Sequence, residues 1–66
     1  MEEVMILTNG KTYLIDDESV TPTQLIMRAG KLDTKFANSW IKQTSVAAFI
    51  LRRNGHKVGE NKTQEE

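Results

Sequence analysis

The chain has no cysteine and only one histidine and one proline among its 66 residues. No disulfide can form, and a single histidine without cysteine is a poor basis for a structural zinc site, so we expect neither metal nor cofactor. A chain of this size buries only about 60% of its unfolded surface. Small domains without disulfides or metals are often stabilised by a partner chain, so we expect a homo-oligomer, in the simplest case a homodimer.

Long apolar runs are also missing. The longest, Val46 to Leu51, has six residues, far fewer than the roughly 20 that a membrane-spanning helix needs. The first residues, MEEVMILT, begin acidic and lack the basic and apolar regions of a signal peptide. We therefore expect no membrane association and a cytoplasmic location.

Residues suited to catalysis are scarce. A nucleophile needs a general base within reach, and the only histidine, His56, directly follows Asn54-Gly55, a dipeptide typical of the end of a helix or a turn. The adjacent carboxylates at 16–18 lack the alternating spacing and glycine of a calcium loop. We expect no enzyme activity and no catalytic residues.

The N-terminal region predicts a β-hairpin over residues 4–15. Two runs of strand-forming residues, VMILT and KTYLI, are separated by Asn9-Gly10. This dipeptide favours the type I′ turn, in which both central residues have positive φ.

The next segment predicts two short helices, at 22–30 and 34–43. Thr21 is the expected N-cap of the first, Pro22 takes its first position, and Gly30 is the expected C-cap. The second begins at Asp33 or Thr34. Its apolar positions fall on one helical face, and its polar positions take the other: Phe36, Ala37, Trp40 and Ile41 against Lys35, Asn38, Ser39 and Lys42.

Residues 46–58 leave two possibilities open. Ala47 and Ala48, a basic pair at 52–53 and the stop at Asn54-Gly55 favour a third helix over 45–54. The alternative is a strand that turns at Asn54-Gly55 into a second hairpin. Helix is the preferred prediction, because the second arm, HKVGEN, is poor strand material.

The predicted fold class is therefore α+β, with a hairpin followed by two or three short helices. We expect a single small domain over 1–59. The last residues, 60–66, have no apolar side chain and are mostly acidic or polar, so we expect a disordered acidic tail.

Charge is unevenly distributed although the net charge is zero. Residues 1–20 hold five acids and one lysine, whereas residues 21–59 hold seven bases and one acid. Two short helices joined by a tight turn resemble the arrangement by which a helix-turn-helix reaches a DNA major groove. The predicted DNA-contacting residues of this basic middle segment are Arg28, Lys31, Lys35, Asn38, Ser39, Lys42, Arg52, Arg53 and Lys57.

The leading hypothesis is a small non-enzymatic regulatory protein that binds DNA. An alternative is a protein-interaction module or an inhibitor of a larger host protein, of the type found in phages and mobile elements. A third is a self-assembling structural subunit. Trp40 fits either the core, beside Phe36, or an interface, and we predict interface roles for Trp40 and Phe49.

Overall fold

The computed structural model describes residues 4–8 and 10–61 and shows a mixture of helices and strands. The predicted α+β class is confirmed. Along the chain the elements are β1 (Met5–Leu7), β2 (Thr12–Ile15), β3 (Glu18–Val20), α1 (Pro22–Leu32), α2 (Thr34–Asn38), β4 (Ile41–Gln43), α3 (Thr44–Arg53) and β5 (Val58–Asn61). No helix in the described part is long and apolar enough to cross a bilayer.

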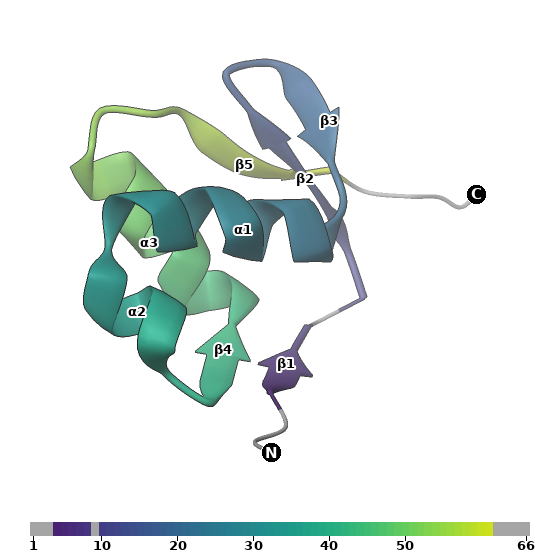
Figure 1. The fold of residues 1–66 in the computed structure, drawn as a ribbon. Helices are drawn as coiled ribbons and strands as arrows, with labels where there is room; N and C mark the ends of the chain where they lie inside the picture. The colour runs from purple at the N-terminus through teal and green to yellow at the C-terminus, as the bar shows by residue number, and fades with distance from the viewer. Residues whose placement is uncertain (1–3, 9, 62–66) are drawn as a thin grey trace.

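Two separate sheets organise these elements (Figure 1). One has three antiparallel strands in the order β3–β2–β5, and the other pairs β1 with β4 in parallel. Helices α1 and α3 lie against the three-stranded sheet, whereas β1 and β4 lie together at the far end of the molecule (Figure 1).

The predicted hairpin at 4–15 is wrong in its pairing. Strand β2 turns instead into β3 through Asp16 and Asp17, whose φ values of 50° and 72° are those of a two-residue hairpin turn. Gly10 has the positive φ expected of it, 79°, and Asn9 lies outside the described residues. Because β3 and β5 occupy both edges of β2, no edge remains there for β1.

The first helix begins as predicted. Thr21 Oγ1 accepts a hydrogen bond from the Gln24 N–H at 3.2 Å, and Gln24 Oε1 accepts one from the Thr21 N–H at 3.1 Å. This reciprocal capping box, with Pro22 at the first position, fixes the start of α1. The predicted C-cap at Gly30 is wrong, because the helix continues to Leu32.

The second helix is shorter than predicted. Asp33 caps it, since its Oδ1 accepts from the Phe36 N–H at 3.0 Å, and the helix ends at Asn38 rather than at residue 43. The next residues pair with β1 as strand β4. Tertiary pairing has overridden the local helical periodicity here.

The third helix is confirmed over nearly the predicted range, and the hairpin alternative for 46–58 is wrong. It ends at Arg53 and is capped by Asn54, whose Nδ2 donates to the Ile50 carbonyl at 2.7 Å. Gly55 follows with a φ of 95°. The chain then enters β5, so Glu60 and Asn61 of the predicted tail belong to a strand. Residues 62–66 lie outside the described residues.

The core lies between α1, α3 and the three-stranded sheet. On α1 and α3 the buried positions recur at helical spacing, and on β2 they alternate with partly exposed ones. The Tyr13 hydroxyl donates to Thr44 Oγ1 at 3.3 Å and joins the sheet to α3. The buried apolar residues are Tyr13, Ile15, Val20, Leu25, Ile26, Ala29, Phe36, Ala47, Ala48, Ile50 and Leu51.

Candidate functional site

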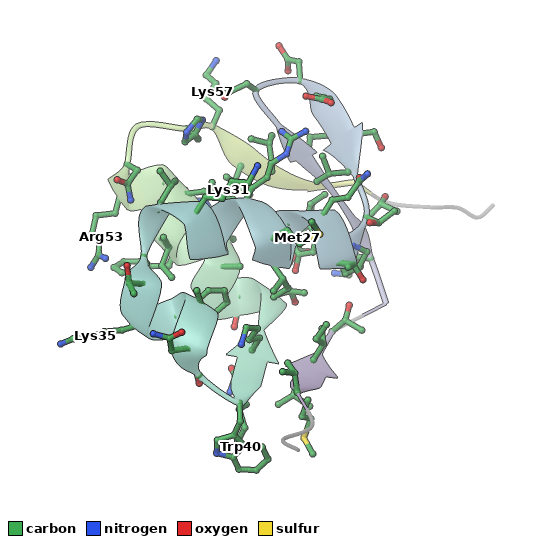
Figure 2. All side chains as sticks on the ribbon, viewed as in Figure 1. Met27, Lys31, Lys35, Trp40, Arg53 and Lys57 are labelled. Atoms are coloured by element: carbon green, nitrogen blue, oxygen red, sulfur yellow. The ribbon has the colours of Figure 1, made fainter. Side chains whose placement is uncertain are left out.

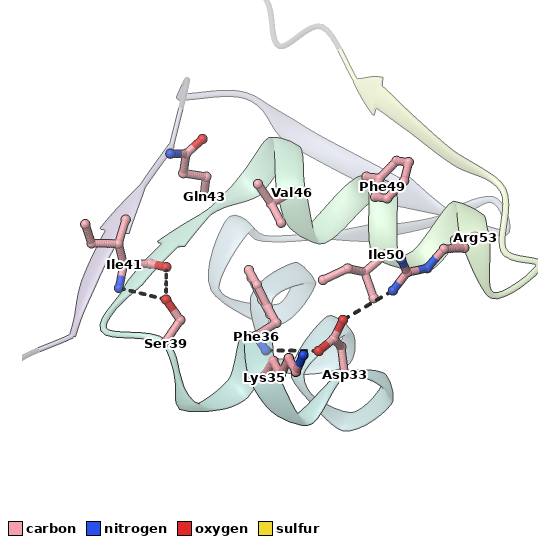
Figure 3. A pocket seen from close by; sticks show the side chains of 10 residues that line it. All are labelled: Asp33, Lys35, Phe36, Ser39, Ile41, Gln43, Val46, Phe49, Ile50 and Arg53. Carbon is pink, nitrogen blue, oxygen red and sulfur yellow. Dashed lines mark hydrogen bonds and ion pairs between the residues drawn. The ribbon is translucent and has the colours of Figure 1, made fainter.

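A groove of about 350 Å³ lies between α2, β4 and α3 (Figure 3). Phe36 and Ile50, both buried, form its floor, and Val46 and Phe49 of α3 stand beside them. Charged and polar groups complete the lining. The full set is Asp33, Lys35, Phe36, Ser39, Ile41, Gln43, Val46, Phe49, Ile50 and Arg53.

The periodicity of α3 explains why this groove has an apolar wall. Ala47, Ala48 and Leu51 face the core. Val46 and Phe49, three residues apart, therefore share the outer face of the helix, where they are 41% and 58% exposed. Two large apolar side chains on one exposed face mark a surface that a partner could cover.

Arg53 is held in place at one end of the groove. Its guanidinium lies 5.5 Å from the centre of the Phe49 ring, one helical turn earlier. Its Nη2 also forms an ion pair with Asp33 Oδ2 at 3.3 Å. The guanidinium therefore contacts both an aromatic ring and a carboxylate at this end of the groove.

Ser39 closes the other end of the groove. Its hydroxyl donates to the Ile41 carbonyl at 2.8 Å and accepts from the Ile41 N–H at 3.3 Å (Figure 3). Both backbone groups of this β4 residue are thus occupied by a side chain.

Lys42 was predicted to lie on the exposed face of the second helix, and this is wrong. It belongs to β4, retains only 9% exposure, and its ammonium donates to the Ser39 carbonyl. The helix ends before Lys42, so the residue no longer shares a face with Lys35. Neither the Lys42 ammonium nor the Ser39 hydroxyl is presented outward with Lys35 and Asn38.

The arginines predicted to contact DNA all have partners within the chain. Arg28 pairs with Glu18 at 3.1 Å, and Arg53 with Asp33. Arg52 donates from Nε and Nη2 to the Val58 carbonyl, at 3.1 and 2.8 Å.

Three predicted lysines, Lys31, Lys35 and Lys57, are exposed, and no side-chain hydrogen bond or ion pair joins them to another described residue. Asn38 is exposed as well. Figure 2 shows Lys35 and Arg53 projecting at the same end of the molecule, whereas Lys57 projects near the turn of the three-stranded sheet. These cations are spread over the surface rather than gathered on one helix.

Trp40 is not a core residue. It is 57% exposed and projects from the end of the molecule beside β4 (Figure 2). The core alternative depended on a continuous helix that would have placed Trp40 one turn after Phe36, and that helix ends at Asn38. The interface role of Trp40 and Phe49 stays a prediction, and both side chains are accessible for it.

A second cluster, around Asp16, was missed by the sequence analysis. The Asp16 carboxylate lies 2.8 Å from His56 Nδ1 and accepts from the Lys57 N–H at 3.0 Å. The hydrogen bond with His56, followed by that from the Lys57 N–H, lowers the pKa of Asp16. The cluster fastens the β2–β3 turn to the segment after α3, residues that are 40 positions apart in the chain.

The hollow beside this cluster offers charged groups. It is lined by Ile15, Asp16, Glu18, Arg28, Lys31, Leu32, Leu51 and His56. No serine, threonine or cysteine is among these lining residues, and the described residues contain no group of three potential metal ligands.

No protein-family model matches the chain, and comparisons with curated proteins and with solved structures give no significant match.

Proposed function

We propose that this chain is a small regulatory protein that acts by binding another protein through the groove between α2, β4 and α3. The observation that carries the proposal is the exposure of Val46 and Phe49 beside a hollow floored by Phe36 and Ile50. Aromatic residues beside a pocket in an apolar surface are common anchors of protein interfaces.

The lining of the groove suits a partner with an apolar anchor beside a carboxylate. Its apolar wall suits one or two large apolar side chains, such as those on one face of a short amphipathic segment. Lys35 at the rim is an exposed cation that suits a carboxylate beside those anchors. Arg53 is a second cation at one end of the groove, where it lies beside the Phe49 ring and pairs with Asp33.

A comparison of alanine variants at two exposed apolar residues tests the proposal. Phe49 and Met27 are similarly exposed, at 58% and 60%, but Met27 lies on α1, away from the groove. Proteins captured from a lysate by the wild type should be retained by Met27→Ala and lost by Phe49→Ala. A purified candidate should then bind Phe49→Ala at least about tenfold more weakly, about 1.4 kcal/mol.

Identical capture by all three proteins would contradict the groove as the binding site. Circular dichroism of each variant controls for folding. We expect Phe49→Ala to remain folded, because Phe49 is outside the core.

DNA binding is a second candidate, supported by the exposed lysines Lys31, Lys35 and Lys57. It predicts that binding of a labelled random duplex weakens steeply as salt rises, since phosphate contacts release counterions. Replacing all three lysines by glutamine should abolish that binding, while Phe49→Ala should leave it unchanged. Absence of binding at low salt with tens of micromolar protein would remove this candidate.

A further inference from the structure

Strand β1 forms an edge that no other described strand covers. Among residues 4–8 and 10–61, its only partner strand is β4, and no strand of this part of the chain pairs with its second edge. Strand β1 lies at the end of the molecule (Figure 1). All three of its residues, Met5, Ile6 and Leu7, are exposed although apolar. Successive side chains of a strand point to opposite faces, so both faces of β1 lack cover.

The register shows which backbone groups face outward. Met5 is opposite Ile41, and its N–H donates to the Trp40 carbonyl at 2.7 Å. In a strand, alternate residues direct their N–H and C=O groups to opposite edges. Met5 and Leu7 therefore face β4, and Ile6 directs its N–H and C=O to the open edge.

The two edges of this small sheet are treated differently. On the β4 side, the Ser39 hydroxyl occupies both backbone groups of Ile41. Natural proteins commonly block exposed edges in such ways to prevent pairing with another chain. No proline, charge or side-chain cap blocks the edge within Val4–Thr8.

We infer that two copies of the chain associate through this edge, with β1 antiparallel to its symmetry mate and Ile6 opposite Ile6 on the two-fold axis. The two Ile6 residues exchange both N–H···O=C hydrogen bonds, which is the closely spaced pair of an antiparallel ladder. The product is a continuous four-stranded sheet in the order β4–β1–β1–β4. This assembly is independent of the groove, which lies on the other side of β4.

A second copy suits this edge for three reasons. A register centred on Ile6 pairs all of 4–8 with itself, with Val4 opposite Thr8, so the edge is self-complementary as a two-fold interface requires. None of these residues is charged, so pairing within 4–8 places no like charges opposite one another. A two-stranded sheet is marginal by itself, and four strands with apolar side chains are a more stable unit.

The experiment introduces charged residues at Ile6, on the two-fold axis, and measures the mass of the assembly by sedimentation equilibrium. The wild type should have about twice the chain mass of 7.5 kDa at tens of micromolar. Ile6→Lys and Ile6→Glu should each sediment as monomers, because each places two like charges directly opposite one another. A mixture of the two variants should restore the dimer, since lysine then faces glutamate.

Ile6→Pro tests the backbone contribution. Proline removes the outward N–H of Ile6 and leaves the hydrogen bonds to β4 intact, as proline is tolerated on an open edge. This variant should be monomeric and folded. A wild type that stays at 7.5 kDa up to hundreds of micromolar would overturn the inference, and so would a dimer that persists in Ile6→Lys.

Discussion

Asp16 illustrates how one side chain can join distant parts of a small fold. Its carboxylate accepts hydrogen bonds at a position where the β2–β3 turn meets the segment after α3. Its own φ is positive, which aspartate tolerates better than most residues. The residue therefore serves both the turn and the long-range contact.

The lowered pKa of Asp16 predicts a pH dependence of stability. A carboxyl whose folded pKa lies below its ordinary value of 3.8 stabilises the fold above that value. This contribution is lost as the pH falls below 3.8 and through the lower folded pKa. Asp16→Asn should therefore reduce the fall in the free energy of unfolding between pH 6 and about pH 2, measured by urea denaturation.

Asp17→Asn is the matched control for this measurement. Asp17 is the other exposed residue of the same turn, and none of the hydrogen bonds above involves its side chain. Its variant should keep the wild-type pH dependence. If the free energy of unfolding fell equally between pH 6 and about pH 2 in the wild type and in Asp16→Asn, the assigned role of the Asp16 carboxylate would be contradicted.

Leu25 is the sharpest residue-level test of the core, because it is fully buried on α1. Leu25→Ala should lower the free energy of unfolding by about 2–5 kcal/mol, through lost burial and the cavity left behind. A chain of this length has about 3–10 kcal/mol of stability, so the variant should be largely unfolded on mild warming. Met27→Ala, two residues away and exposed, should change stability by less than about 0.5 kcal/mol.

At the level of elements, local signals predicted all three helices, although the second ends earlier than expected. Thr21 and Pro22 specify the start of α1, and Asn54-Gly55 specifies the end of α3. The start of α2 was predicted as well, but its early end at Asn38 and the strand β4 after it were not. Pairing of Met5 with Ile41 determines where α2 gives way to β4, and no local pattern records that pairing.

The strands show the same limit. An Asn-Gly dipeptide between two strand-like runs predicted a hairpin, yet β2 pairs with β3 and with the distant β5. Both neighbours are weak strand material by composition, ESV and VGEN. They form strands because their backbones hydrogen-bond to the two edges of β2, which contains the buried Tyr13 and Ile15. This tertiary pairing outweighs the low strand propensity of their residues.

Gly30 provides an element-level prediction. It lies inside α1 without a positive φ, and an added Cβ would meet the Ala37 Cβ at 3.4 Å. Gly30→Ala should therefore raise the free energy of unfolding by up to about 1 kcal/mol. Gly55→Ala should lower it instead, because the φ of 95° after α3 is strained for alanine. Thermal unfolding of both variants measures whether the free energy of unfolding rises or falls in each.

Across the whole molecule, the groove could not be predicted although several of its residues were named. Lys35, Ser39, Phe49 and Arg53 were expected in separate roles, on DNA or at an interface. Their convergence depends on β4 turning the chain back beside α3. The exposure of Phe49 could be predicted from the helical spacing of 46–51, but the hollow beside it could not.

Association of two chains would also appear in thermal unfolding. A folded dimer is favoured by mass action, so the wild-type Tm should rise with protein concentration. The Tm of Ile6→Lys should be independent of concentration. Calorimetry between about 10 and 500 µM compares the two, and a constant wild-type Tm would contradict the dimer.

The pairing of β1 with β4 has a consequence for synthesis on the ribosome. Met5–Leu7 emerges well before Ile41–Gln43, its only described partner. During that interval the apolar strand has no native neighbour, whereas β2 and β3 are separated by only the two residues of their turn. Nascent chains on one message therefore carry an unpaired β1 at the same time, and encounters between them compete with the completion of each fold.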